Sequence, residues 1–325
     1  MNKLKPWRVT IDTNPDICNL KCIMCDTHSI YNKHNTYNRE EMPKELLEKC
    51  LNQVLNLGVK EIIPTTMGEP LMYKHMDVFV SYISNSTAKL NLTTNGTFPR
   101  KNIEQWSKIL LPILSDIKIS INSINPNINE KIMCRDNTRK KIEDIKIISR
   151  LRDKFYPNVS ITLQVTFLKQ NIPYLEELIC FAIDHGLNRV KGHQLWVNYD
   201  CLNSESLEFN NENRNLWNDF IDKVDKYRKY INLVNFNKLN LDNFKSDVNK
   251  NSVCPFLGKE LWIDYEGNFN ICCAPSEKRR ELGYWGNIKE KSISEIFNSE
   301  QYLKLLKNYK NFAVCKICPL KRSAI

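Results

Sequence analysis

The sequence predicts an α/β protein in which parallel strands alternate with helices. Six short apolar runs typical of strands lie between residues 7 and 196, and most are separated by stretches with helical periodicity. Six strand–helix alternations over about 190 residues require parallel strands with right-handed crossovers. They are too few to close an eight-stranded barrel. We therefore expect an open sheet of six parallel strands.

Hydrophobic spacing places the individual elements. The helix expected at residues 138–154 directs Ile142, Ile145, Ile148 and Leu151 inward, and Gly58 and Gly186 mark the ends of two other helices. The expected strands are at residues 7–11, 59–66, 89–96, 116–122, 159–167 and 189–196. The expected helices are at residues 40–56, 75–84, 103–114, 138–154 and 172–185.

Beyond residue 200 the pattern changes. Residues 201–252 are rich in Asn and charged side chains, with one helix expected near 212–231, and should bridge two parts of the chain. Residues 261–271 alternate as a β-hairpin that turns at Glu266-Gly267-Asn268, and 292–309 are helical. We therefore divide the chain into a strand–helix part at 1–200, a bridging segment at 201–252 and a small hairpin–helix domain at 253–325.

The composition limits the possible compartments and partners. Of the 325 residues 42% are hydrophobic and 26% charged, which is ordinary for a globular protein. No apolar run approaches the ~20 residues of a membrane span, and the N-terminus lacks a signal peptide. We expect a cytoplasmic protein with no membrane partner. The net charge of +10 is dispersed, so a Lys-rich solvated surface explains it and a nucleic-acid partner is not expected.

Twelve cysteines in a cytosolic chain indicate metal ligation or catalysis rather than disulfides. Cys18, Cys22 and Cys25 have the spacing C-x3-C-x2-C directly after the first strand. Three thiolates are one short of a closed zinc site or a fully ligated iron–sulfur cluster. If they hold a cluster, one iron stays open for another ligand, which is typical of a reactive site. A zinc knuckle or a chance grouping is the alternative.

A second cysteine set brackets the hairpin. Cys254 and Cys272 flank it, and Cys315 and Cys318 follow as C-x2-C. Four thiolates complete either a closed iron–sulfur cluster or a structural zinc ribbon, so spacing alone leaves both open. Cys273, beside Cys272, is an alternative ligand, an inert neighbour or a hydrogen-atom donor.

The first cysteine motif resembles the signature of the radical S-adenosylmethionine (radical SAM) superfamily, with Met24 where an aromatic residue is usual. Met67-Gly68-Glu69-Pro70 resembles the Gly-Gly-Glu segment after the family's second strand, with Met67 replacing the first glycine. Thr94-Asn95-Gly96 is also similar to a family motif. The resemblance implies a partial (β/α)6 TIM barrel. In such folds chemistry gathers at the C-terminal ends of the strands, where these motifs fall.

The resemblance also implies roles for individual residues. Cys18, Cys22 and Cys25 would hold a [4Fe–4S] cluster whose open iron binds S-adenosylmethionine. Gly68 and Glu69 would bind the amino group of its methionine moiety, since a carboxylate accepts well from an ammonium. The remaining cofactor contacts implied are Thr94, Asn95, Ser120 and Arg135, with Asn122 where the family usually has Asp.

The C-terminal cysteines resemble the shortened, twitch-like form of a SPASM extension. On this resemblance Cys254, Cys272, Cys315 and Cys318 carry one auxiliary [4Fe–4S] cluster. Two clusters and S-adenosylmethionine are then the cofactors, and a low-potential donor such as flavodoxin or ferredoxin is the electron partner.

The expected activity is reductive cleavage of S-adenosylmethionine to a 5′-deoxyadenosyl radical, which abstracts hydrogen from a small polar substrate. The four-cysteine pattern is similar to that of an aminocyclitol dehydrogenase of this superfamily, so an oxidation of a sugar or aminocyclitol is favoured. His193, on the sixth strand, is a candidate on the substrate side.

Two alternatives remain. One is epimerisation or crosslinking of a ribosomally made peptide, with Cys134, Cys201 or Cys273 as the thiol donor. Most such enzymes carry an N-terminal peptide-binding domain, and here the first strand begins within ten residues. The other is a non-catalytic zinc-ribbon binding module.

Overall fold

A nine-stranded sheet forms the centre of the computed structural model, which describes residues 3–33, 39–65, 67–135, 137–240, 252–274, 279–316, 318 and 322–323. The strand order is β10-β9-β1-β2-β3-β4-β5-β6-β7. Strands β1 to β7 and β9 run parallel to their neighbours, and β10 is antiparallel to β9. The bounds are β1 Arg8–Ile11, β2 Glu61–Pro64, β3 Lys89–Thr94, β4 Leu114–Ser120, β5 Ser160–Phe167, β6 Arg189–Gln194, β7 Asn232–Val234, β9 Glu260–Ile263 and β10 Phe269–Asn270.

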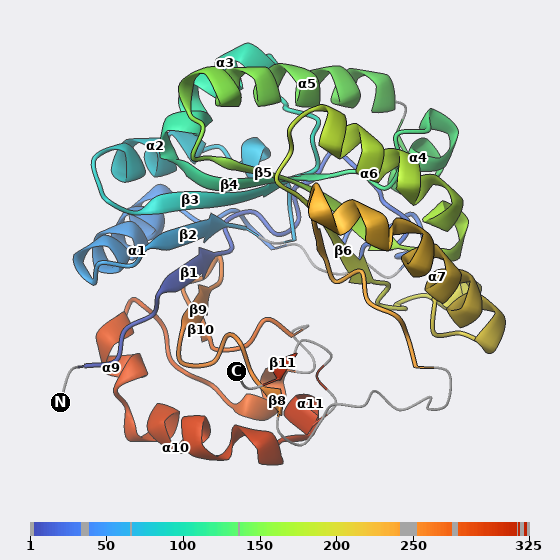
Figure 1. Ribbon diagram of the computed structural model, residues 1–325. Coiled ribbons are helices and arrows are strands. Elements are labelled where there is room, and N and C mark those ends of the chain that lie inside the picture. The colour runs from blue at the N-terminus through green and yellow to red at the C-terminus, as the bar shows by residue number, and fades with distance from the viewer. Residues whose placement is uncertain are drawn as a thin grey trace.

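The helices lie mainly on one face of this sheet, with α3 and α5 at the top of Figure 1. The α/β class and the partial barrel are therefore confirmed, and the six expected strands, β1 to β6, are extended in parallel by β7 at one edge and β9 at the other. In this part the bounds are α1 Lys44–Asn56, α2 Met76–Ser84, α3 Ile103–Leu110, α4 Pro126–Met133, α5 Thr138–Phe155, α6 Leu175–Asp184 and α7 Asn211–Val224. Farther along are α9 Ile293–Phe297, α10 Glu300–Asn308 and α11 Ala313–Lys316, while β8 Ser252–Val253 pairs with β11 Arg322–Ser323.

Two elements differ from expectation. The helix expected at 103–114 ends at Leu110, because a short 3-10 turn, Leu111–Ile113, leads directly into β4. Helix α4 lies between β4 and α5, where no helix was expected. Its N-terminus is capped by Asn125, whose side chain accepts from the Asn127 N–H.

Alternate residues of β4, β5 and β6 face opposite sides of the sheet. One set is apolar, packs under the helices and is at most 1% exposed: Ile117, Ile119, Ile161, Leu163, Val165 and Val190. The other set, the inner face, is polar and partly exposed: Lys118, Ser120, Gln164, Thr166, Lys191 and His193.

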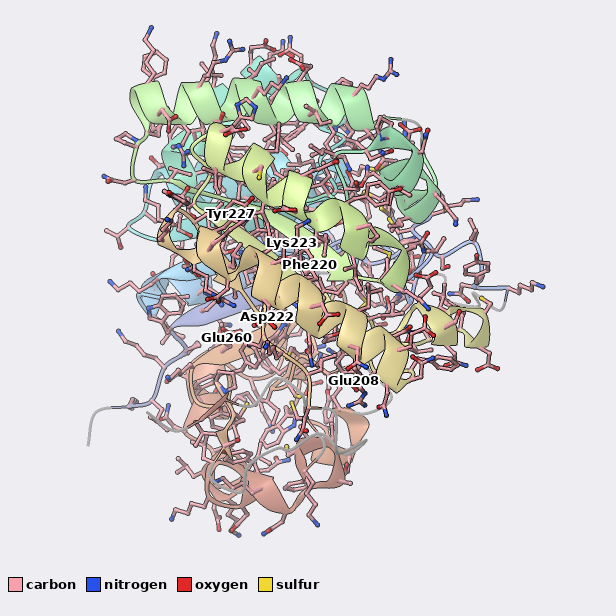
Figure 2. All side chains as sticks on the ribbon, turned by 45° about the vertical axis from the view of Figure 1, so that its right-hand side comes forward. Glu208, Phe220, Asp222, Lys223, Tyr227 and Glu260 are labelled. Carbon is pink, nitrogen blue, oxygen red and sulfur yellow. The ribbon has the colours of Figure 1, made fainter. Side chains whose placement is uncertain are left out.

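The segment at 201–252, expected as a bridge, contributes α7 and the seventh parallel strand as far as residue 240. Residues 241–251 lie outside the described ranges. Trp217 of α7 is fully buried, with its ring centroid 4.4 Å from that of Phe167 on β5. Lys223 and Tyr227, labelled in Figure 2, both contact the Glu176 carboxylate of α6. This stretch therefore packs as part of the barrel.

The C-terminal hairpin joins the same sheet. Its first strand, β9, pairs parallel with β1, and Gly267 turns the chain with φ +92°. Arg8 at the start of β1 forms ion pairs with Glu61 of β2 at 2.6 Å and Glu260 of β9 at 2.8 Å (Glu260 is labelled in Figure 2). One guanidinium therefore holds the three strands in register. None of the described helices is long and apolar enough to cross a bilayer.

We predict that Arg8→Met lowers the free energy of unfolding by about 3 kcal/mol, because two largely buried carboxylates lose their shared cation. Urea-unfolding curves measure the effect. Lys304→Met is the matched control: its pair with Glu300 is 71% and 82% exposed, so its loss should cost below about 1 kcal/mol. Equal losses in the two variants would contradict the structural role of Arg8.

Candidate functional site

The loop after β1 carries the first three cysteines and is held by apolar residues between them. Leu20 and Ile23 are 2% and 5% exposed and pack in a small cluster with Ile132 and Met133 of α4. The Ile23 N–H also donates to the Ile132 carbonyl at 2.9 Å. The intervening residues therefore anchor the loop, while the three cysteine side chains remain partly exposed.

The three thiols lie close enough for their charges to interact. Burial, together with the charges of Cys25 and Cys18, raises the pKa of Cys22 to about 12. Burial, together with the charges of Asp26 and Cys18, raises the pKa of Cys25 to about 11. Two N–H groups point at the sulfurs: Asn95 Nδ2 lies 3.6 Å from Cys18 Sγ, and the His28 backbone nitrogen lies 3.2 Å from Cys25 Sγ. The loop thus concentrates thiols and supplies donors to their thiolates.

Gly68 allows the loop after β2 to pack directly on the cysteine loop. A Cβ at this position would lie 1.9 Å from the Asn14 carbonyl oxygen and 2.8 Å from that of Ile17. The next residue, Glu69, donates its N–H to the Ile17 carbonyl at 2.8 Å. The close approach that requires glycine is therefore between two backbone segments of the protein.

Glu69 connects the loops after β2 and β3. Its side chain is fully buried and accepts from Thr94 Oγ1 at 2.7 Å, the Asn95 N–H at 2.6 Å and the Leu71 N–H at 3.2 Å. Burial raises the pKa of Glu69 to about 7, although these donors favour its ionised form. A carboxylate has about four acceptor sites, so Glu69 can take one further donor.

The remaining predicted contacts lie around the same loop. Ser120 ends β4, and Arg135, just after α4, donates to the Asn19 carbonyl of the cysteine loop at 2.8 Å. Asn122, where the family usually has Asp, is buried and accepts from the Thr166 N–H at 3.0 Å. Asn122 therefore joins β4 to β5, which explains an amide at this position.

The second thiol set gathers in the C-terminal part. Cys254 follows β8 and Cys272 follows β10, while Cys315 lies in α11 and the Cys318 N–H donates to its carbonyl at 3.4 Å. Burial raises the pKa of Cys254, and the charges of Cys272 and Cys318 raise it further. The fold thus brings cysteines from three separate segments together.

The pKa values of the adjacent thiols Cys272 and Cys273 shift in opposite directions. The hydrogen bond from the Cys273 thiol lowers the pKa of Cys272 to about 6 and raises that of Cys273. Cys272 Sγ also accepts from the Ala274 N–H at 3.4 Å. Of the two thiols, Cys272 is therefore the one whose ionised form is favoured by its surroundings.

Both cysteine sets consist only of thiols. Thiolates hold iron–sulfur clusters, so the donor types of both sets fit [4Fe–4S] clusters, and four thiolates also fit a structural zinc ion. Within the described ranges no three or more His, Cys, Asp or Glu side chains have the spacing of ligands to one ion.

Some residues near the cysteines were missed by the sequence analysis. Tyr199 Oη donates to the Cys25 carbonyl at 2.9 Å, and Asn14 Nδ2 donates to the Glu69 carbonyl at 2.8 Å. Lys141 is a fully buried lysine of α5 beside this region. Of these three residues, only Lys141 could have been noticed in the sequence, because it lies on the apolar face of the helix expected at residues 138–154.

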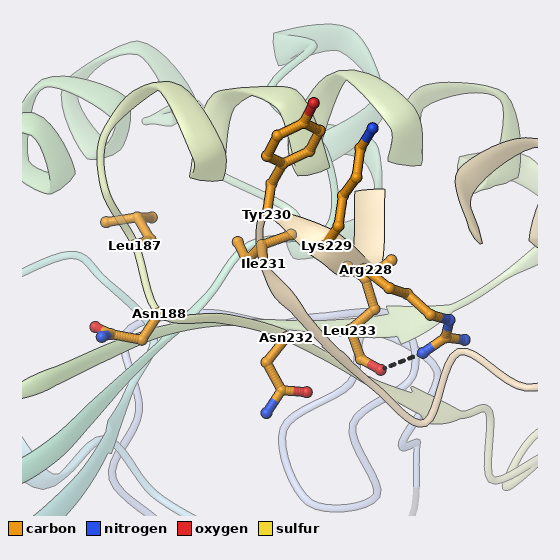
Figure 3. A pocket seen from close by; sticks show the side chains of 8 residues that line it. All are labelled: Leu187, Asn188, Arg228, Lys229, Tyr230, Ile231, Asn232 and Leu233. Carbon is orange, nitrogen blue, oxygen red and sulfur yellow. Dashed lines mark hydrogen bonds between the residues drawn. The ribbon is translucent and has the colours of Figure 1, made fainter. Parts of the chain in front are cut away.

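A surface hollow elsewhere is separate from this site. It lies between the turn before β6 and the segment leading into β7, and Leu187, Asn188 and residues 228–233 line it (Figure 3). These residues precede or begin their strands, whereas the cysteine loop follows the C-terminal end of β1. The hollow therefore lies at the N-terminal ends of the strands, on the side of the sheet away from the cysteine loop.

Two family profiles match the chain, and together they include both thiol sets. The profile of the radical SAM superfamily matches residues 15–182, more than half of the chain, and the profile of an iron–sulfur cluster-binding domain, SPASM, matches residues 254–319. The first range includes the three-thiol loop, and the second includes all four cysteines of the second set.

Individual relatives are more distant. The chain is 27% identical over 179 residues to an uncharacterized protein of Methanocaldococcus jannaschii, covering 53% of this chain and 57% of that protein. It is 29% identical over 133 residues to the GTP 3′,8-cyclase of Nautilia profundicola, covering 39% of each. The chain therefore spans about half the length, or less, of the curated relatives it matches.

Solved structures match a longer part of this chain than the curated sequences do. SuiB of Streptococcus suis gives a TM-score of 0.66 at 18% identity, covering 93% of this chain and 68% of its own. BtrN gives 0.54 at 16% identity, covering 100% and 95%. Structures of SuiB and anSMEcpe hold S-adenosylmethionine. From the matching profiles we conclude that this chain belongs to the radical SAM superfamily, with [4Fe–4S] clusters and S-adenosylmethionine as its cofactors.

Proposed function

We propose that this enzyme reductively cleaves S-adenosylmethionine and uses the 5′-deoxyadenosyl radical to abstract hydrogen from a small polar substrate, in an oxidation. Cys18, Cys22 and Cys25 hold the cluster that binds the cofactor, and Cys254, Cys272, Cys315 and Cys318 hold the auxiliary cluster. The auxiliary cluster held by these four cysteines would supply an acceptor for the electron that such an oxidation releases. A low-potential donor such as flavodoxin or ferredoxin supplies the electron for cleavage.

The residues of the chain bind and orient the cofactor. Glu69 has one acceptor site left for the cofactor's ammonium, and Asn95 binds both Glu69 and Cys18, which couples the two loops. Ser120 and the Arg135 guanidinium contact the cofactor's carboxylate and ribose. Arg135 also donates to the Asn19 carbonyl, so the same guanidinium would connect the cofactor to the cysteine loop.

The polar inner face of β4, β5 and β6 carries the substrate proposal. Lys118 and Arg189 pair with Asp116, at 3.0 and 2.8 Å, toward the N-terminal ends of these strands. Gln164, Thr166 and His193 provide hydrogen-bonding groups toward the C-terminal ends, where the cysteine loop lies. Burial, together with the charges of Lys191 and Lys118, lowers the pKa of His193 to about 4. His193 is therefore a neutral imidazole near pH 7, suited to a hydroxyl or amine of a sugar or aminocyclitol.

The second candidate is modification of a peptide. Two similar structures, SuiB with the precursor peptide SuiA and anSMEcpe with the Kp18Cys peptide, hold peptides, whereas BtrN holds 2-DOIA. A peptide backbone can also form hydrogen bonds with the polar inner face of β4, β5 and β6. The two candidates differ in which added compound donates hydrogen to the cofactor.

We predict that anaerobically assembled protein contains about eight iron atoms per chain, because each [4Fe–4S] cluster holds four. Cys18→Ala should reduce iron to about four and abolish formation of 5′-deoxyadenosine. Cys254→Ala should lose a similar amount of iron yet still cleave the cofactor, since its cluster is separate. Elemental analysis and chromatography measure both, and Cys50→Ala, a buried cysteine outside both sets, is the control. Zinc without iron would refute the proposal.

The substrate class is tested by hydrogen transfer. With dithionite as reductant, carbon-deuterated aminocyclitols or sugars should pass deuterium into 5′-deoxyadenosine, detected by mass spectrometry. Short deuterated peptides should give only the background found without substrate, because they are not the proposed hydrogen donor. Transfer from peptides alone would replace the first candidate by the second.

His193→Ala should lower substrate-dependent deuterium transfer at least tenfold, because the inner face loses a hydrogen-bonding group. Cleavage of S-adenosylmethionine without substrate should stay within about twofold of wild type. Tyr230→Ala, in the hollow at the opposite ends of the strands and 64% exposed, is the control and should change neither rate. A parallel loss of both rates in His193→Ala would assign the histidine to the cofactor rather than to the substrate.

A further inference from the structure

Lys141 is a lysine buried beside the cysteine loop. It lies in the first turn of α5, its side chain is 0% exposed, and its ammonium donates to the Ser120 carbonyl at 3.1 Å and to Met133 Sδ at 3.2 Å. The aliphatic part packs under the loop after β3: a Cβ on Gly96 would lie 3.1 Å from Lys141 Cδ. The fold therefore encloses the whole side chain.

This position is costly for a cation. Moving an ammonium out of water carries a penalty of several kcal/mol unless an opposite charge offsets it. Across the described part of the chain, no carboxylate forms an ion pair with Lys141, whereas Lys118, the other largely buried lysine near the sheet, has Asp116 at 3.0 Å. Neutral oxygen and sulfur acceptors satisfy the hydrogen bonds of Lys141 without balancing its charge.

The nearest negative charges are those of the cofactor site. Met133 receives contacts from both sides: Lys141 Nζ reaches its sulfur, and Cys22 Sγ lies 3.9 Å from its carbonyl oxygen. The ammonium and the cysteine sulfur are thus separated by a single residue. Burial lowers the pKa of Lys141 to about 8, against the opposing influence of Cys22 and Glu69.

We propose that Lys141 is the buried counter-charge of the cluster bound by Cys18, Cys22 and Cys25, and that it raises the reduction potential of this cluster. The proposal rests on the cluster assigned under Proposed function. Three thiolates bring negative charge into a partly buried site, and reduction adds one more electron. A fixed cation nearby stabilises the reduced form most, and net charge is one of the determinants of cluster potentials. Lys141 acts on the cluster through its charge, from the far side of Met133, and makes no bond to it.

The test measures the midpoint potential of the first cluster by redox titration with EPR detection, without S-adenosylmethionine, in protein that also carries Cys254→Ala so that a single cluster is read. Lys141→Met should make reduction at least tenfold less favourable, which corresponds to about 59 mV for a one-electron couple. Lys141→Gln, which keeps a donor for the Ser120 carbonyl, should give a similar shift.

Lys140→Met is the matched control. Lys140 is the adjacent residue of the same helix, but its side chain is 62% exposed and pairs with Asp144. Water and salt screen an exposed charge, so its removal should leave the reduction equilibrium within about threefold of wild type. Iron content and thermal unfolding are recorded for each variant to show that the cluster and the fold are retained.

The outcomes are distinct. A shift in both Lys141 variants and none in Lys140→Met supports the proposal. Unchanged potentials in iron-loaded Lys141 variants overturn it, as does a shift confined to Lys141→Met, which would indicate packing or hydrogen bonding instead of charge. If the Lys141 variants bind no iron, Lys141→Arg, which keeps the charge, should restore iron and potential, and its failure would also overturn the proposal. A wild-type protein without iron would instead refute the proposed function.

Discussion

The arrangement of the site depends on the contact between the loops that follow β1 and β2. Gly68 lies so close to the Asn14 and Ile17 carbonyls that no side chain fits, and the Glu69 N–H bonds to Ile17. Because the Glu69 carboxylate then binds the β3 loop through Thr94 and Asn95, three strand ends are joined in series. The position of the cysteine loop is thereby set by contacts with the loops that follow β2 and β3.

This explains why the first motif works as a unit with the later ones. In a parallel sheet the strands end on the same side, so residues 55 positions apart, Asn14 and Glu69, and residues 77 positions apart, Cys18 and Asn95, meet there. Asn95 shows the result most directly: its backbone N–H binds Glu69, and its side chain reaches Cys18 and Asn19. A change in any of these loops is therefore transmitted to the thiols.

Much of this could be predicted from the sequence, because the six strands are apolar on the helix side and the cysteine motif has a characteristic spacing. The rest depended on tertiary contacts. In α5 the buried face includes Lys141 and Arg152 together with Ile145 and Ile148, whereas Ile142 and Leu151 are only partly buried. Apolar spacing cannot find a stripe that contains two cations, because their burial depends on partners distant in sequence. The short strand β7 and the parallel pairing of β9 with β1 are likewise decided by packing.

Strand β1 also links the two thiol sets mechanically. At its start Arg8 binds Glu260 of β9, and just beyond its end the Asp12 N–H donates to the Ile263 carbonyl at 2.8 Å. The hairpin that leads to Cys272 is thus registered against the same strand that presents Cys18 to Cys25. Because all four residues of β9 pair with β1, the hairpin that leads to Cys272 cannot shift relative to the loop that carries Cys18 without breaking the sheet. The fold thus fixes one member of the second thiol set relative to the first set.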